Sequence, residues 1–307
     1  MELTERRAWF GRQIAGRAGI PEDSKIARAF AAIPREDFVG PPPWRIFGER
    51  EDSVTVSSDP AALYQDVLVQ LKGMGAINNG QPSLHALCFA ALEVKEGEIV
   101  THVGAGTGYY TAILGVLTGG EGRVEGYEIE QDLAERAAEN LRSMPWVRIH
   151  ATSGTEGPLA VCDVLYVSAG ATTPLAVWLD ALRVEGRLLF PLTPDEGYGA
   201  MLLVTRSVQG YAARFICGAK FISCVGARDP AMEKTLAECF RKGHAERVRS
   251  LWRDNQPDET AWCAGNGWWL STREVSTAER DHPAPPQSLP NPLRYAAETT
   301  AKLLRYT

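Results

Sequence analysis

Three glycines and one carboxylate are spaced as a nucleoside site requires. They are Gly104, Gly106, Gly108 and Glu128. The glycines follow an apolar segment, 99–103, and the carboxylate follows a second one, 124–127. Glycines let the backbone turn tightly and let a ligand approach without a Cβ in the way. The helix expected next presents unpaired N–H groups at this turn, and a strand-end carboxylate can accept both hydroxyls of a ribose.

The spacing of the glycines distinguishes between two cofactor classes. A dinucleotide fingerprint reads Gly-x-Gly-x-x-Gly, whereas here the third glycine, Gly108, comes one position early. The shorter form is typical of S-adenosylmethionine (AdoMet)-dependent methyltransferases, because their cofactor has no pyrophosphate. AdoMet is therefore the predicted cofactor. A tight turn without a ligand and an NAD-binding enzyme are the alternatives.

Composition bounds the class of protein. The chain has 307 residues, of which 45% are hydrophobic and 23% charged, which is ordinary for a globular protein. A formal net charge of −6 disfavours a nucleic-acid partner, which needs a basic face. We expect no membrane span, because no long apolar run is present, and a cytoplasmic location with reduced, mostly buried cysteines. The histidines and cysteines lack metal-ligand spacing, so no metal is predicted.

The elements around the glycine turn predict an α/β fold. A helix near 131–143 lies between strands at 124–128 and 147–151, which is a parallel βαβ crossover. The continuous apolar run at 164–167 is typical of a strand buried on both faces. Segments 201–206, 212–217 and 220–225 alternate with glycines and are expected to form an antiparallel edge. The fold class is therefore a doubly wound, mostly parallel, Rossmann-like sheet with an antiparallel edge.

Three regions are expected along the chain. Residues 1–60 contain two helices, within 1–33, that are interpreted as a collar outside the core. Residues 61–228 form the cofactor-binding domain, and 229–307 form a small helical extension. Its expected helices are at 231–242, 244–253 and 294–305. The oligomeric state is not determined by the sequence.

With these residues in place, the chain resembles the protein-L-isoaspartate O-methyltransferase family over roughly 30–228. The matching points are Pro34-Arg35-Glu36-Asp37-Phe38-Val39, Tyr64-x-Asp66, Gln81-Pro82, the glycine turn, Glu128, the strand at 163–168, and Gly186-Arg187-Leu188. The glycine turn alone is a weak signal, but the whole series in order is specific for fold and cofactor.

The resemblance implies a role for several residues. The implied cofactor-binding residues are Gly104, Gly106, Thr107, Gly108, Glu128, Ser153, Asn78, Gly80 and His85. Asp66 and Asn79 are the implied substrate-binding residues, and His85 and Asn79 are the candidates for catalysis. Asp66 is equally interpreted as a loop cap.

The chain departs from the family pattern at three positions, so the resemblance supports the fold and the cofactor better than it supports an isoaspartyl acceptor. The family's loop serine falls on Gly80, the acid at the end of the first strand on His102, and the adenine-side acid on Ser153. Gly80→Ser is expected to raise activity on an isoaspartyl peptide if the chain is a weakened isoaspartyl methyltransferase. His102 is either a hydrogen-bonded core histidine or a cofactor contact.

The predicted function is AdoMet-dependent methyl transfer to a carboxylate of a peptide, a protein or a small acid. A carboxylate is ionised at pH 7, so it needs no general base, and alignment with desolvation can supply most of the acceleration. Two alternatives remain open: an O- or N-methyltransferase of a specialised metabolite, and a non-catalytic binding module that keeps the AdoMet fold.

Overall fold

The computed structural model describes residues 2–48, 54–73, 77–195 and 197–275. The helices are α1 (Leu3–Arg17), α2 (Lys25–Ala32), α3 (Pro82–Leu92), α4 (Tyr109–Thr118), α5 (Gln131–Asn140), α6 (Ala176–Ala181) and α7 (Pro230–Lys242). The strands are β1 (Trp44–Phe47), β2 (Val54–Ser57), β3 (Leu68–Lys72), β4 (Ile77–Asn78), β5 (Ile99–Val103), β6 (Arg123–Tyr127), β7 (Val147–His150), β8 (Cys162–Val167), β9 (Leu182–Leu192), β10 (Gly199–Ser207), β11 (Gly210–Ala219), β12 (Ser250–Trp252), β13 (Ala261–Gly265) and β14 (Trp268–Ser271).

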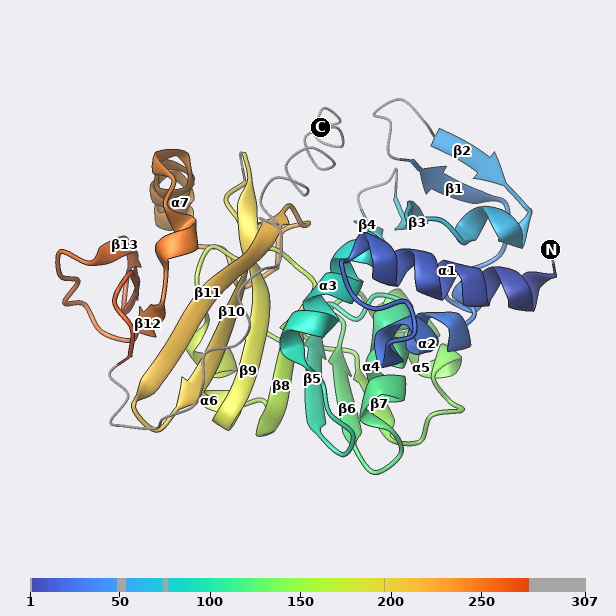
Figure 1. Cartoon of the computed structure of the whole chain (residues 1–307), viewed down its shortest axis with the longest axis horizontal. Coiled ribbons are helices and arrows are strands. Elements are labelled where there is room, and N and C mark those ends of the chain that lie inside the picture. Colours follow the sequence, from blue (N-terminus) through green and yellow to red (C-terminus); the bar gives the residue numbers. More distant parts are fainter. Residues whose placement is uncertain (1, 49–53, 74–76, 196, 276–307) are drawn as a thin grey trace.

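The main sheet has ten strands in the order β13-β14-β12-β11-β10-β9-β8-β5-β6-β7 (Figure 1). Strands β7, β6, β5, β8 and β9 are parallel, and β10 and β11 continue the sheet in antiparallel pairing. The predicted parallel sheet with an antiparallel edge is confirmed. Segment 220–225 is not the third antiparallel strand that was expected, because its only bridge is a parallel one, between Gly170 and Ser223.

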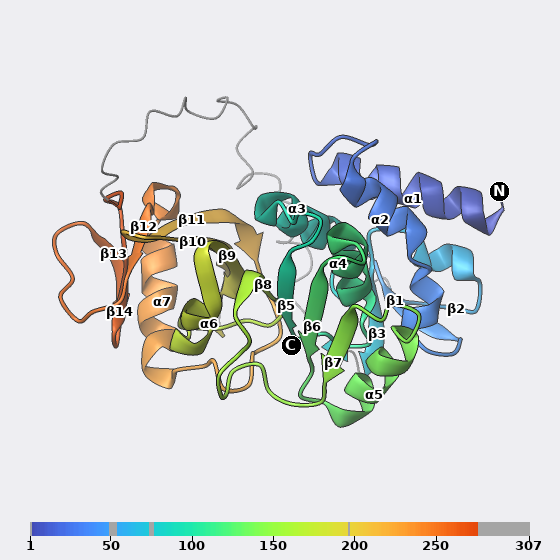
Figure 2. The same cartoon turned by 90° about the horizontal axis from the view of Figure 1, so that it is seen from below.

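Both faces of the sheet are covered, and successive strand residues alternate between two hydrophobic clusters. Val164 and Tyr166 of β8 lie in the cluster formed with α1 to α4, while Leu165 and Val167 lie in the cluster formed with α6 and α7. Figure 2 shows α3 and α4 on one side of the strands and α6 and α7 on the other. Since side chains alternate along a strand, a continuous apolar run serves both clusters.

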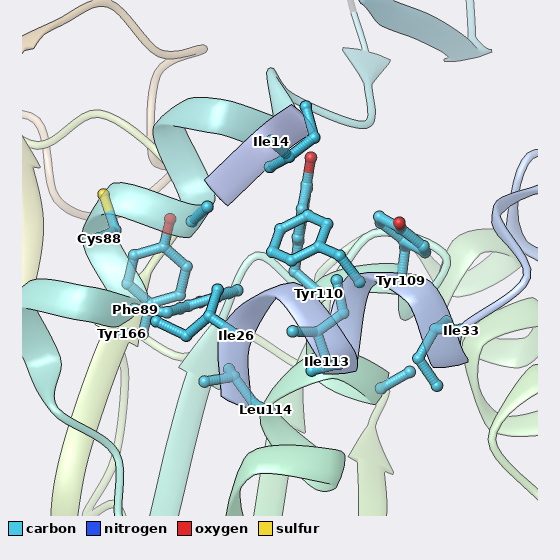
Figure 3. Close-up of a cluster of buried hydrophobic side chains, with 14 of the residues drawn as sticks. Ile14, Ile26, Ile33, Cys88, Phe89, Tyr109, Tyr110, Ile113, Leu114 and Tyr166 are labelled. Carbon is cyan, nitrogen blue, oxygen red and sulfur yellow. The ribbon is translucent and has the colours of Figure 1, made fainter. Parts of the chain in front are cut away.

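The N-terminal helices are part of the core, so the prediction of a collar outside it is wrong. Phe10, Ile14 and Phe30 are fully buried in the first cluster. Phe30 of α2 makes edge contacts with Tyr109 and Tyr110 of α4, with ring centroids 6.4 Å apart in both pairs. Figure 3 shows residues of α1, α2, α3 and α4 meeting in this cluster. The apolar faces of α1 and α2 therefore cover the helices that position the glycine turn.

A second, four-stranded sheet with the order β2-β1-β3-β4 was not predicted. Its strands have two to five residues each, and all its pairs are antiparallel. Strand β3 lies between β1 and β4, so this sheet joins the segment after α2 to the loop before α3.

The C-terminal extension is only partly helical in the described residues. Helix α7 confirms the helix expected at 231–242, but the expected helix at 244–253 is wrong, because that segment forms a 3-10 turn and β12. Strands β12, β14 and β13 add to the sheet beyond β11. The helix expected at 294–305 lies outside the described residues. The boundaries at 60 and 228 stay predictions.

The contact between α1 and α2 gives a test of packing with a matched control in one helix. A Cβ added to Gly11 would lie 2.2 Å from the carbonyl oxygen of Ala27, whereas a Cβ on Gly16 would have its nearest neighbour, Glu22 Oε1, at 3.6 Å. We expect Gly11→Ala to lower the free energy of unfolding by about 1–3 kcal/mol. Gly16→Ala is expected to be neutral or to stabilise by up to about 1 kcal/mol, because alanine favours the helix. Urea unfolding measures both, and equal effects would contradict this packing.

Candidate active site

The glycine turn between β5 and α4 depends on backbone conformations that favour glycine. Gly104, Gly106 and Gly108 have φ of +81°, +56° and +94°. The N–H groups of Gly104 and Ala105 donate to the carbonyl oxygen of Tyr127, at 2.9 and 3.0 Å, which fastens the turn to the end of β6. Residues with a Cβ rarely adopt such values, so the turn retains its shape only with glycine.

Glu128 lies directly against this turn. One carboxylate oxygen accepts the N–H of Gly106 at 2.7 Å, and the other accepts the N–H of Glu130 at 3.0 Å. The residue is 7% exposed, and burial raises the pKa of its carboxyl group. Each carboxylate oxygen has two lone pairs, so both oxygens can still accept a hydroxyl. The carboxylate therefore fits a nucleoside ribose.

The turn lies where the strand order changes direction. Strand β5 has β6 on one side and β8 on the other, and the chain leaves β5 toward β6 before it returns to β8. The N–H of Ser168, just after β8, donates to the carbonyl oxygen of Val103 at 2.8 Å. In open α/β sheets, ligands bind beyond the carboxyl ends of the strands at such a switch point.

Strand β3 of the small sheet contacts the same region. A Cβ added to Gly106 would lie 3.5 Å from Leu71 Cδ1. The ammonium group of Lys72 pairs with Glu130 at 2.6 Å and with Asp132 at 2.7 Å. The small sheet therefore reaches the glycine turn and the first residues after Glu128.

The loop that leads into α3 brings Asn78, Gly80 and His85 together. The side-chain oxygen of Asn78 accepts the N–H of Gly80 at 2.9 Å, and Gly80 has φ +70°. A Cβ on Gly80 would lie 2.3 Å from Nε2 of His85. A serine at position 80 does not fit while His85 keeps its place. The expectation that Gly80→Ser raises activity, if the chain is a weakened isoaspartyl methyltransferase, stays a prediction and requires His85 to move.

The two residues predicted to bind substrate are engaged within the protein. Asp66 accepts the N–H and hydroxyl of Ser83, at 2.8 and 2.6 Å, and the side-chain N–H of Gln81 at 3.0 Å. It caps the start of α3, which is the loop-cap interpretation. The side-chain oxygen of Asn79 accepts the N–H of Val69 at 2.8 Å, while its Nδ2 is buried without a partner in the described structure. Their substrate contacts stay predictions.

Ser153 and Thr107 flank the turn. Ser153 shares a hydrogen bond of 2.7 Å with Thr155, in the loop after β7. A Cβ on the next residue, Gly154, would reach Val103 at 2.6 Å, so this loop runs beside the end of β5. The side chain of Thr107 is buried, and its carbonyl oxygen accepts the side-chain N–H of Asn140 at 2.9 Å. Both predicted residues therefore lie beyond the carboxyl ends of their strands, Thr107 after β5 and Ser153 after β7.

His102 is a hydrogen-bonded core histidine, which is one of the two interpretations of the sequence. Its Nδ1 pairs with Thr111 and its Nε2 with Ser168, both at 2.9 Å. The residue is 1% exposed, and burial lowers the pKa of the imidazole to about 3. Because both nitrogens are occupied and the ring stays neutral, His102 is unsuited to act as a general base at pH 7.

The sequence analysis assigned no role to Arg35, Tyr110 or Tyr166, which support this site. The guanidinium of Arg35 is fully buried and holds the loop 63–67. Tyr110 and Tyr166 enclose His85. The only signals were the Arg35 match within the resemblance and a tyrosine pair directly after the glycine turn; neither shows which atoms meet.

These features define an α/β protein with a candidate nucleoside site at the carboxyl edge of a parallel sheet. The model of the family described as protein-L-isoaspartate(D-aspartate) O-methyltransferase (PCMT) matches residues 13–228. The chain belongs to this family. Its members are AdoMet-dependent methyltransferases, so the predicted family and enzyme class are confirmed. The match begins inside α1, within the segment that was interpreted as a collar.

Similar proteins agree with this membership. A protein-L-isoaspartate O-methyltransferase from Ignicoccus hospitalis is 27% identical over 211 residues, covering 67% of this chain and 92% of its own. A second, from an Anaeromyxobacter species, is 29% identical over 225 residues, covering 71% and 82%. Two solved structures share the fold. One is a protein-L-isoaspartate O-methyltransferase with a TM-score of 0.60 and 21% identity, covering 81% of this chain and 71% of the other.

The other structure is described as a protein-L-isoaspartate O-methyltransferase of Plasmodium falciparum in complex with S-adenosyl-L-homocysteine (AdoHcy). Its TM-score is 0.57 at 19% identity, covering 72% of this chain and 98% of the other. In the described part of this chain, no helix is long and apolar enough to cross a bilayer. Within those same residues, no three His, Cys, Asp or Glu side chains gather as a metal site would require. All six cysteines are buried free thiols, as predicted.

Proposed function

We propose that this protein transfers the methyl group of AdoMet to a carboxylate of a peptide or protein. The cofactor supplies an electrophilic methyl group on a sulfonium. Glu128 would accept the ribose hydroxyls, and the glycine turn would let the nucleoside approach the backbone. The observation that carries the cofactor assignment is the Glu128 carboxylate held 2.7 Å from the N–H of Gly106 at the switch point.

The histidines favour a carboxylate as the methyl acceptor. An amine or phenol must lose a proton, and an effective base has a pKa near the working pH. Burial lowers the pKa of His85 well below its ordinary value, with smaller contributions from the charges of His102 and Arg35. His102, at about 3, is also too weakly basic. A carboxylate is already ionised at pH 7 and needs neither residue.

The test uses AdoMet labelled in its methyl group and two synthetic peptides of one sequence, with a single aspartyl or isoaspartyl residue. We expect one labelled methyl group on at least one peptide, and its complete loss as methanol in mild base. Mass spectrometry before and after base treatment measures both. A methyl group that survives base would identify an ether or an amine and contradict the proposal. Absence of methyl transfer to both peptides would also contradict it.

Calorimetry with AdoHcy serves as the control for the cofactor. We expect binding by the wild-type chain whether or not either peptide is methylated. Absence of both a binding heat and a thermal shift would favour the non-catalytic alternative.

A further inference from the structure

His85 occupies the space that a side chain on residue 80 would need. Gly80 has φ +70°, and a Cβ added there would lie 2.3 Å from His85 Nε2 and 3.1 Å from its Cδ2. Real Cβ atoms do not approach other atoms so closely. Residue 80 and residue 85 therefore form one unit in which the imidazole, and not residue 80, presents a polar group at this loop.

The imidazole is fixed by two tyrosines. Its ring stacks on Tyr110, with centroids 3.5 Å apart and planes 8° from parallel. Its Nδ1 is 2.8 Å from the hydroxyl of Tyr166. Tyr110 also donates its hydroxyl to the carbonyl oxygen of Gly80 at 3.1 Å. Figure 3 shows Tyr110 and Tyr166 beside the helices of this cluster. Because Tyr110 follows the glycine turn, the unit is tied to the cofactor side.

The contact between Tyr166 and Nδ1 is compatible with either neutral tautomer of the ring. His85 is 2% exposed, and its lowered pKa keeps the ring neutral at pH 7, so one nitrogen carries hydrogen. If the Tyr166 hydroxyl donates to Nδ1, the hydrogen is on Nε2. No described residue hydrogen-bonds to Nε2, which lies beside Gly80 in the loop that leads into α3.

We propose that His85 is an acceptor-binding residue whose Nε2–H donates a hydrogen bond to the carboxylate that receives the methyl group. This inference rests on the proposed function. A neutral donor orients a carboxylate while leaving its charge intact, whereas a cation would form an ion pair and reduce its nucleophilicity. Gly80 is required because any side chain there displaces the donor.

The tautomer can be measured without any acceptor. Nitrogen NMR of the protein labelled at histidine distinguishes a ring nitrogen that carries hydrogen from one that does not. We expect His85 Nε2 to carry hydrogen in the wild type, and Tyr166→Phe to produce a mixture of tautomers. A wild-type Nε2 without hydrogen would overturn the assignment as a donor, whatever the activity of the protein.

Kinetics with the isoaspartyl and aspartyl peptides tests the role. We expect His85→Leu to raise KM for the methylated peptide at least tenfold, with kcat changed much less. His85→Gln places an amide N–H near the position of Nε2, so it is expected to restore KM to within about threefold of wild type. The matched control is His150→Gln. His150 lies in β7 and pairs with Glu125, outside this unit. A wild-type KM in His85→Leu would overturn the inference.

Two further measurements separate failure of this inference from failure of the proposed function. A loss of AdoHcy affinity in His85→Gln that exceeds its change in KM would show that His85 binds the cofactor, as the resemblance implies, and would overturn the inference. If the wild type forms an ester but His85→Leu keeps its KM, only the inference fails. If the wild type methylates neither peptide, the proposed function fails, and with it the carboxylate as partner of Nε2.

A double-mutant cycle tests the steric link between the two positions. Gly80→Ala is expected to lower the melting temperature of the wild type more than that of His85→Ala, because the second background has room for the added Cβ. Backbone strain at φ +70° remains in both backgrounds and cancels in the comparison. Equal shifts would show that the two residues do not share this space.

Discussion

Replacing Glu128 with alanine is expected to weaken AdoHcy binding by about tenfold to a hundredfold, which corresponds to about 1–3 kcal/mol. The variant loses the acceptor of the ribose hydroxyls and leaves the N–H groups of Gly106 and Glu130 without their partner. Calorimetry measures the dissociation constant. Glu128→Gln keeps one acceptor oxygen, so we expect a smaller loss.

The matched control for this variant is Glu125→Gln on β6, the strand that Glu128 follows. Glu125 is also buried, but its carboxylate pairs with His150 at 2.7 Å, away from the glycine turn. We expect its AdoHcy affinity to equal that of the wild type. An unchanged affinity in Glu128→Ala would refute the ribose assignment.

The pH dependence of binding is part of the same expected result. Burial raises the pKa of Glu128, whereas ribose hydroxyls donate to the ionised form and lower that pKa. Affinity is therefore complete above the raised pKa and falls as the pH is lowered through it. In Glu128→Ala this dependence is expected to disappear. The same dependence in wild type and variant would show that another group titrates.

Replacing Arg35 with alanine is expected to lower the free energy of unfolding by about 3–5 kcal/mol. One terminal nitrogen donates to the carbonyl oxygens of Leu63 and Gln65, at 2.5 and 3.0 Å. The other donates to Val67 at 2.5 Å and to the side-chain oxygen of Asn79 at 3.3 Å. The guanidinium also lies 5.9 Å from the ring of Phe10. Its loss leaves several buried acceptors unpaired at once.

Urea unfolding measures this effect, with two comparisons. Arg35→Lys keeps the charge, but its single nitrogen cannot serve the acceptors on both sides of the guanidinium, so we expect a substantial loss there too. Arg241→Ala changes an exposed arginine at the end of α7, and its effect is expected to stay within about 0.5 kcal/mol. Equal stability of Arg35→Ala and Arg241→Ala would contradict the structural role of Arg35.

The elements that the sequence predicted correctly are those with local signals. The glycine turn, its flanking strands and the helix from Pro82 depend on residue types within a few positions of each other. The short strands β12 to β14 were missed because three to five residues do not establish a period, and β12 pairs with strands that lie far away in the chain. The apolar faces of α1 and α2 were visible, but not the helices against which they pack.

The site could be predicted in part for the same reason. Glu128 follows its strand directly, so its place beside the turn could be inferred from connectivity alone. The overlap between a residue 80 side chain and His85 depends on how the loop joins α3, which is a matter of a few ångströms in space. The sequence left open whether Asp66 caps the start of α3 or binds substrate, because an acid in a loop can do either.

Strands β12, β14 and β13 extend the main sheet beyond β11, so β13 is its edge strand instead of β11. Backbone groups of β11 at Tyr211 and Ala212 face β12, and the ladder then passes through β14 to β13. Exposed strand edges invite pairing with other chains. A chain shortened at residue 228, where the family match ends, would lose β12, β14 and β13 and leave the edge of β11 at Tyr211 and Ala212 unpaired. We expect such a shortened chain to aggregate more readily than the full chain, because β11 could then pair with strands of other chains.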